Sequence, residues 1–128
     1  MRAILALLTA MTLTSILSAQ SQSEWWRNAA VYQIYPRSYQ DSNGDGMGDI
    51  NGICQRLDYL AELGVDMLWL TPVYCSPKRD NGYDVADYRH IDPAFGTLAD
   101  MAQLIAKAAE RGMGIMMDIV ANHTSTEH

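Results

Sequence analysis

Short runs of strand-forming residues alternate with segments of helical periodicity along most of this chain. Residues 31–35 are rich in β-branched and aromatic side chains, and residues 65–70 and 114–120 form two further apolar runs. Pro36 and Pro72 close the first two runs. An order of strand, helix, strand, helix, strand predicts a parallel sheet with right-handed crossovers, whose strands should be buried on both faces.

Both helical segments carry boundary signals. The first follows a loop dense in Gly and Asp over 41–52 and ends at Gly64. Its apolar positions are Ile53, Leu57, Leu60 and Ala61. The second starts at Thr97, an N-cap with Asp100 as its capping-box partner, and ends at Gly112. Its predicted buried face comprises Leu98, Met101, Ile105 and Ala108.

Polar groups gather where the predicted strands end. The loops after the first two strands are long and polar, the second running over 73–96, whereas the loops after the helices are short. Asp118 lies near the end of the third strand, Asn122 and His123 follow it, and the chain stops five residues after His123. Enzymes built as α/β barrels place their chemistry at the carboxyl ends of the strands and need ~250 residues in all. The pattern therefore predicts the beginning of an active-site face.

Composition narrows the class of partner. The formal net charge of −6 argues against nucleic acid, because phosphate binding needs clustered Lys and Arg. Cys54 is expected in a helix and Cys75 in a loop, as two buried free thiols, although export would permit a disulfide. The three tryptophans (Trp25, Trp26 and Trp69) are interpreted as packing residues rather than sugar platforms.

The first residues differ from the rest. Arg2 supplies a positive start, an apolar stretch covers 3–17, and the small residues Ala19 and Ser21 follow. This is the three-part pattern of a secretory signal peptide over 1–21. A membrane anchor or an amphipathic helix is the alternative, but a spanning helix needs ~20 apolar residues. We expect an exported protein, periplasmic or extracellular, whose mature part over 22–128 has no stable membrane span.

The loop over 41–49 has the composition of a cation site. Side-chain oxygens come at alternate positions, from Asp41, Asn43, Asp45 and then Asp49, with glycines between them. Such oxygens suit Ca²⁺, and carboxylates this dense repel one another unless a cation neutralises them. An EF-hand is excluded because Gly52 stands at the twelfth position, where a bidentate Glu is required. An Asx-rich turn without metal is the alternative.

Several motifs in order resemble the N-terminal part of the α-amylase family of glycoside hydrolases, closest to its oligo-1,6-glucosidase and α-glucosidase branch. The resemblance runs from Trp25 to His128, and its motifs cover 25–26, 31–38, 41–49, 57–60, 68–74, 80–84 and 118–125. It implies a (β/α)₈ TIM barrel, of which this chain carries about three βα units. It also implies a structural Ca²⁺ held by Asp41, Asn43, Asp45, Asp49 and the carbonyl of Met47.

The resemblance assigns sugar-binding roles to four side chains. Asp80 would help to hold the terminal glucose, and Tyr83 would stack on the same ring. His123 would donate to a glucose hydroxyl at the point of cleavage, and Asp118 would orient the groups of that subsite. Without the resemblance, Asp80 reads as a solvated loop acid, Tyr83 as a packing residue and His123 as a satisfied core histidine.

The reaction needs residues that this chain does not supply. Retaining glycoside hydrolysis uses two carboxyls roughly 5 Å apart. In the family these follow the fourth and fifth strands, so no residue here matches them, and the 128 residues alone are expected to be inactive. The complete relative would hydrolyse short α-linked gluco-oligosaccharides with retention. A glucose-transferring or isomerising enzyme, similar to a trehalose synthase, and a non-catalytic calcium- or sugar-binding module are the alternatives.

Overall fold

The computed structural model describes residues 24–128, so the predicted signal peptide over 1–21 lies outside the described residues. The elements in chain order are η1 (Trp25–Arg27), β1 (Val31–Ile34), α2 (Pro36–Tyr39), α3 (Ile50–Gln55), α4 (Leu57–Glu62), β2 (Met67–Leu70), β3 (Tyr74–Cys75), β4 (Asp87–Ile91), α5 (Leu98–Ala109) and β5 (Gly114–Met117). No helix in this part of the chain is long and apolar enough to cross a membrane.

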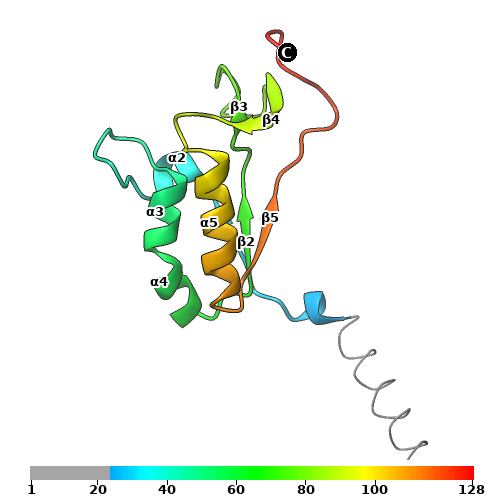
Figure 1. Cartoon of the computed structure of the whole chain (residues 1–128). Coiled ribbons are helices and arrows are strands. Elements are labelled where there is room, and N and C mark those ends of the chain that lie inside the picture. The colour runs from blue at the N-terminus through cyan, green and yellow to red at the C-terminus, as the bar shows by residue number, and fades with distance from the viewer. Residues whose placement is uncertain (1–23) are drawn as a thin grey trace, which may run out of the picture.

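The central feature is a parallel sheet in the order β1-β2-β5, which confirms the predicted α/β class. Ile34 pairs with Leu70, and Leu70 pairs with Met117, so the three strands end at the same level. Helices α3, α4 and α5 lie together on one side of this sheet (Figure 1). This arrangement is that of the N-terminal part of a TIM barrel.

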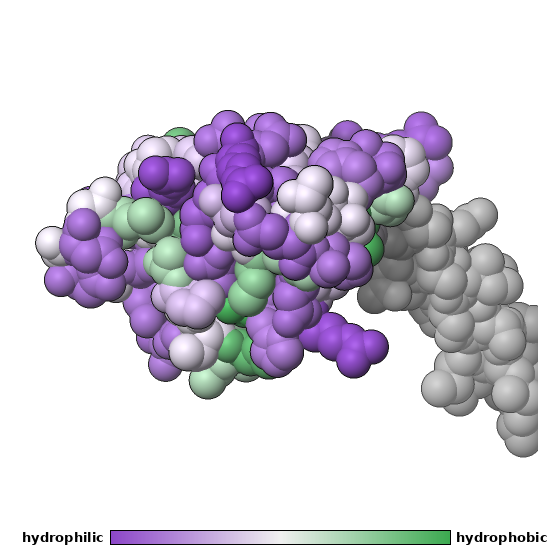
Figure 2. Space-filling view, turned by 90° about the horizontal axis from the view of Figure 1, so that it is seen from above, coloured by the Kyte–Doolittle hydropathy of each residue, from purple (hydrophilic) through white to green (hydrophobic). Residues whose placement is uncertain are grey.

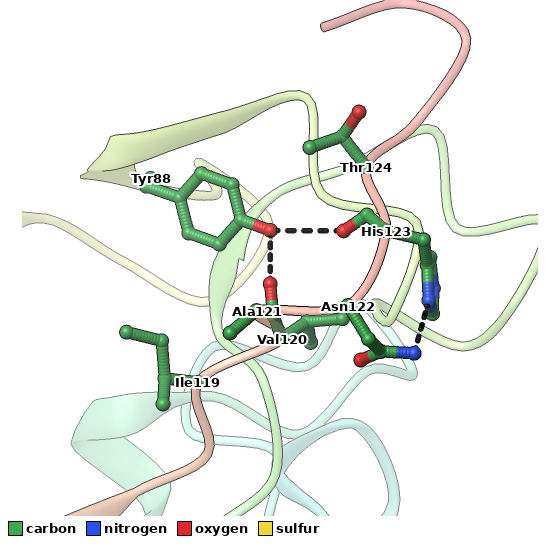
Figure 3. Close-up of a pocket in the computed structure, with 7 residues that line it drawn as sticks. All are labelled: Tyr88, Ile119, Val120, Ala121, Asn122, His123 and Thr124. Carbon is green, nitrogen blue, oxygen red and sulfur yellow. Dashed lines mark hydrogen bonds between the residues drawn. The ribbon is translucent and has the colours of Figure 1, made fainter.

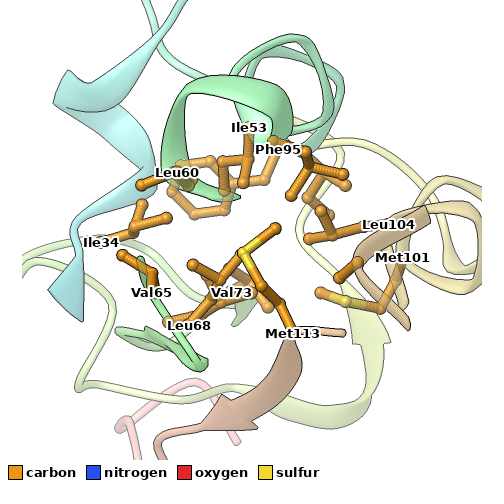
Figure 4. Close-up of a cluster of buried hydrophobic side chains, with 14 of the residues drawn as sticks. Ile34, Ile53, Leu60, Val65, Leu68, Val73, Phe95, Met101, Leu104 and Met113 are labelled. Carbon is orange, nitrogen blue, oxygen red and sulfur yellow. The ribbon is translucent and has the colours of Figure 1, made fainter. Parts of the chain in front are cut away.

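The core lies between the sheet and these helices. Leu68 and Leu70 of β2 are fully buried, whereas Met67 and Trp69, on the other face of the strand, are only partly buried. Leu68 packs in a cluster with side chains from α3, α4 and α5, among them Leu60 and Leu104 (Figure 4). The sheet is therefore covered well on one face only.

The helices differ from prediction in three details. The first helical segment begins at Ile50, inside the predicted loop, because the Asp49 carboxylate caps it by accepting from the Gly52 amide at 2.6 Å. It is then divided at Arg56 into α3 and α4. The Thr97–Asp100 capping box of α5 is confirmed. Its predicted buried face is partly wrong, because Leu98 and Ile105 are exposed and the buried positions are Met101, Leu104 and Ala108.

The third strand is shorter and more exposed than predicted. β5 ends at Met117 rather than at residue 120, and none of its four residues is fully buried. Among the strands of residues 24–128 it pairs with β2 alone, and Ile119 beyond it is 74% exposed. The expectation of burial on both faces assumed cover on both sides of the sheet, and residues 24–128 cover one.

The long loop over 73–96 contains an element that the sequence did not reveal. β3 and β4 pair antiparallel within it, which places Cys75 in a strand rather than in a loop. Cys54 lies in α3 as predicted, and both cysteines are free thiols of intermediate burial. Trp25 and Trp26 are more than half exposed, so their interpretation as packing residues is wrong.

Candidate functional site

The candidate site lies at the carboxyl ends of β2 and β5. Asp118 directly follows β5, and the segments around β3 and β4 lie beside the chain that continues toward residue 128 (Figure 1). Seen from above, this end presents mostly hydrophilic residues (Figure 2). It is the end at which the sequence predicted sugar-binding side chains.

Asp118 is held by two donors. Its amide donates to the carbonyl of Leu70 at 3.0 Å, which extends the pairing of β5 with β2. The indole Nε1 of Trp69 donates to Oδ1 at 2.6 Å, and the phenol of Tyr83 donates to Oδ2 at 2.7 Å. Both carboxylate oxygens therefore have fixed directions, which suits a residue that orients its neighbours.

The contact with Asp118 changes the pKa of the Tyr83 phenol. The hydrogen bond to Asp118 raises the pKa of Tyr83 to about 12, with burial and the negative charges of Asp118 and Asp80 adding to the rise. Because the pKa is raised, the contact stabilises the fold fully below the ordinary tyrosine value of 10.0 and loses its effect as the pH passes 12. The phenol is consequently a neutral donor at physiological pH.

Asp80 and Tyr83 belong to one tight turn. The Tyr83 amide donates to the Asp80 carbonyl at 2.9 Å, and Asn81 and Gly82 between them both have positive φ, at 54° and 100°. A Cβ on Gly82 would lie 3.1 Å from the carbonyl oxygen of Pro72, so the turn packs closely on the segment after β2. The Asp80 residue itself is exposed.

His123 lines a separate hollow of about 450 Å³, bounded by Tyr88 and residues 119–124 (Figure 3). The phenol of Tyr88 donates to the carbonyls of Val120 and His123, the second at 3.2 Å. The amide Nδ2 of Asn122 donates to Nδ1 of His123 at 2.9 Å. With Nδ1 as the acceptor, the imidazole carries its proton on Nε2, where it can donate to a ligand.

The structure thus joins some of the predicted site residues and not others. Tyr83 and Asp118 are in direct contact, and Asp80 is tied to Tyr83 through the backbone. Within residues 24–128, no hydrogen bond links His123 to any of these three. Its exposed segment follows Asp118 along the chain and is anchored by Tyr88 instead.

Sequence reasoning missed three organising side chains. Trp69 was expected in the core, but the alternation of β2 puts it on the face opposite Leu68, where its N–H reaches Asp118. Residues 67–70 are apolar throughout, so the sequence does not mark which face of the strand is buried. Asp84 lies within the 80–84 motif, but its contacts with Ser76 and with loop amides, like the contacts of Tyr88 with residues distant along the chain, follow no local pattern.

In the loop over 41–49, side-chain oxygens accept hydrogen bonds from the loop's own backbone amides. Asp41 accepts from the amides of Asn43, Gly44 and Gly46 at 3.0, 2.7 and 2.8 Å, and these bonds, that of Gly46 foremost, hold its pKa below the usual range. The side chain of Asn43 accepts from the Asp45 amide, and that of Asp45 accepts from the Met47 amide.

Asp49 is placed differently from the other predicted metal ligands. Its two oxygens accept from the Gly52 amide and from the amide and hydroxyl of Ser42. In the described part of the chain, no three His, Cys, Asp or Glu side chains are grouped to hold a metal ion. Two of the five predicted ligands, the Asn43 side chain and the Met47 carbonyl, are not His, Cys, Asp or Glu side chains and so fall outside that grouping. The donor set is entirely oxygen, the chemistry that Ca²⁺ requires.

Comparison with known proteins decides the family. Residues 33–128 match the family described as alpha amylase, catalytic domain. The chain belongs to the α-amylase family. It is 61% identical over 107 residues to a glucan 1,6-alpha-glucosidase of Streptococcus pneumoniae, covering 84% of this chain and 20% of that protein. An oligo-1,6-glucosidase of Heyndrickxia coagulans is 59% identical over 106 residues, covering 83% and 19%.

Solved structures of related enzymes superpose on this member of the α-amylase family. A trehalose-6-phosphate hydrolase of Bacillus licheniformis superposes with a TM-score of 0.80 at 55% identity, covering 81% of this chain and 19% of that one. A trehalulose synthase matches with the same TM-score and coverage at 50% identity. The chain therefore spans about one fifth of the length of these relatives, and glucosidase-type enzymes dominate among them.

Proposed function

We propose that this chain forms the N-terminal part of a retaining α-glucosidase-type hydrolase of short α-linked gluco-oligosaccharides. The observation that carries the proposal is the contact of Tyr83 with Asp118 at the carboxyl ends of the strands, in a chain of this family. Asp80, Tyr83, Asp118 and His123 would bind one glucose unit. The nucleophile and the acid would come from strands that follow, so these residues bind and orient the sugar without forming or breaking its bonds.

An exchange experiment tests this proposal. Residues 24–128 would replace the matching segment of the Heyndrickxia coagulans oligo-1,6-glucosidase, giving what we call the exchange enzyme. We expect it to hydrolyse a chromogenic α-glucoside with a kcat/KM within roughly tenfold of the parent, because differences of that size correspond to only ~1.4 kcal/mol of transition-state binding. A folded exchange enzyme without turnover would contradict the proposal. The 128-residue chain alone should show no turnover above a buffer blank.

We also propose that the loop over 41–49 binds a structural Ca²⁺ through Asp41, Asn43, Asp45, Asp49 and the Met47 carbonyl. Such an ion would draw together the side chains that now accept amides within the loop. Ca²⁺ at a hundredfold excess over its Kd should stabilise the fold by ~2.7 kcal/mol, seen as a rise in the melting temperature. Asp45→Asn should abolish most of that rise, and Glu62→Gln, at an exposed position of α4, should keep it. An equal rise in all three proteins would contradict the site.

Export follows from the proposed signal peptide over 1–21, which we propose directs the protein to the periplasm or the cell exterior. Expression of the full chain in a bacterial host, followed by N-terminal sequencing of the product, should give a mature start near residue 22. Recovery of the product from the cytoplasm with Met1 in place would contradict export.

A further inference from the structure

The turn that carries Asp80 and Tyr83 is built around the carboxylate of Asp84. Oδ1 accepts from the hydroxyl of Ser76 at 2.7 Å and from the amide of Asp80 at 3.2 Å. Oδ2 accepts from the amide of Arg79 at 2.9 Å. One side chain thereby joins both sides of the loop between β3 and β4.

The backbone of this turn needs such support. Lys78 and Asn81 have φ values of 60° and 54°, in the left-handed region that residues with a Cβ rarely adopt. Each such residue costs of order 1–3 kcal/mol unless the surroundings hold it. No regular strand or helix pairing covers residues 76–84, so beside the bond from the Tyr83 amide to the Asp80 carbonyl the turn relies on side-chain acceptors.

Neighbouring contacts anchor the start of the turn independently. The Ser76 hydroxyl, which donates to Asp84, also accepts from the Lys78 amide at 2.9 Å. The ammonium of Lys78 lies 2.6 Å from the buried carboxylate of Asp92. The base of the turn is therefore fixed to β4 and its continuation, whereas its tip, with Asp80 and Asn81, is held through Asp84.

Asp84 is suited to this task as an anion. Burial opposes its charge, but the hydrogen bonds from Ser76, Arg79 and Asp80 outweigh burial, so the pKa of Asp84 lies below its usual value. A carboxylate can accept from all three donors at once. An Asn in its place would direct an NH₂ group toward backbone N–H or hydroxyl donors and lose at least one bond.

We propose that Asp84 is a positioning residue, which holds the turn so that Asp80 and Tyr83 face the glucose site and the Tyr83 phenol reaches Asp118. The role in placing sugar-binding residues rests on the proposed function, but the hydrogen bonds of Asp84 do not depend on a bound sugar. Without Asp84 the turn relaxes, and the Tyr83 phenol loses its partner.

The titration of Tyr83 in the 128-residue chain tests this. The chain is prepared with ¹³C-labelled tyrosine rings, and the Tyr83 resonance is assigned by its loss in Tyr83→Phe. We expect a pKa of about 12 in the unchanged chain and a fall toward 10.0 in Asp84→Asn. Asp118→Asn, which removes the partner directly, calibrates the value for a lost contact. Asp87→Asn is the matched control, because that carboxylate contacts Arg89 and His90 on β4 and not the turn.

Two outcomes would overturn the positioning role. One is an unchanged Tyr83 pKa in a folded Asp84→Asn chain, and the other is an equal fall in Asp87→Asn. If Asp84→Asn fails to fold, so that the partly buried Tyr39 and Tyr74 also titrate at 10.0, Ser76→Ala decides the matter. That variant removes one of the three donors, and an intermediate Tyr83 pKa supports the role while an unchanged one overturns it. No sugar enters the titration, so failure of glucose binding in the exchange enzyme would be a separate result.

Discussion

Gly52→Ala should abolish the folded state of this chain. A Cβ at Gly52 would lie 1.9 Å from the carbonyl oxygen of Gln40, a backbone atom that cannot move aside without displacing α2. The same residue donates its amide to the Asp49 cap at 2.6 Å, so a backbone shift that relieves the clash would also weaken the cap. We expect more than about 4 kcal/mol of destabilisation, an exceptional size for one substitution. Circular dichroism and urea titration would measure it.

Gly64→Ala is the matched control for that experiment. Gly64 has a φ of +83° but nothing within 4 Å of its hypothetical Cβ, so only the left-handed backbone penalty applies. That penalty is roughly 1–2 kcal/mol. Equal losses of stability in the two variants would show that the close approach of α3 to Gln40 is not what makes Gly52 necessary.

Asp118→Asn should produce the largest loss of activity among the binding-site variants of the exchange enzyme. The carboxylate accepts from Trp69 and Tyr83, and hydrogen bonds to a charged group are worth ~1.5–3 kcal/mol each. Asn keeps one acceptor oxygen, so Trp69 and Tyr83 compete for it, one of the two bonds is lost and the other no longer involves a charged acceptor. We expect a fall in kcat/KM of roughly 10²–10³-fold, since each 1.4 kcal/mol is tenfold.

Asp87→Asn should leave kcat/KM within about threefold of the value for the unsubstituted exchange enzyme, since surface ion pairs contribute under ~1 kcal/mol. The Asp87 carboxylate is solvent-accessible and pairs only with Arg89 and His90 nearby. A similar small effect for Asp118→Asn would contradict its orienting role. A fall in kcat alone, with KM unchanged, would indicate that Asp118 acts in the transition state and not in ground-state binding.

The fold was predictable where one local rule decides. The run at Val31–Ile34, the cap at Thr97 and the stop at Gly112 each follow from their own side chains, and the parallel order followed from their alternation. Prediction failed where a distant contact decides. Gly48 and Gly52 pack closely against the backbone of residues 36–40, and no local pattern displays that approach.

The candidate site shows the same division. Family motifs indicated Asp80, Tyr83, Asp118 and His123, and the structure joins Tyr83 to Asp118. The supporting contacts of Trp69, Tyr88 and Asp84 join residues that lie 4 to 49 positions apart in the sequence. They depend on the tertiary arrangement of the segments that carry them. Residue type alone could not indicate those partners.

Tyr83 and His123 are proposed to bind the same sugar ring, and a crystal structure of the exchange enzyme with bound glucose would show whether they do. We expect the Tyr83 ring against one face of the glucose at ~4 Å and Nε2 of His123 donating to a hydroxyl of the same glucose at ~3 Å. A glucose that contacts one of these residues while the other lies outside its reach would contradict the shared binding site.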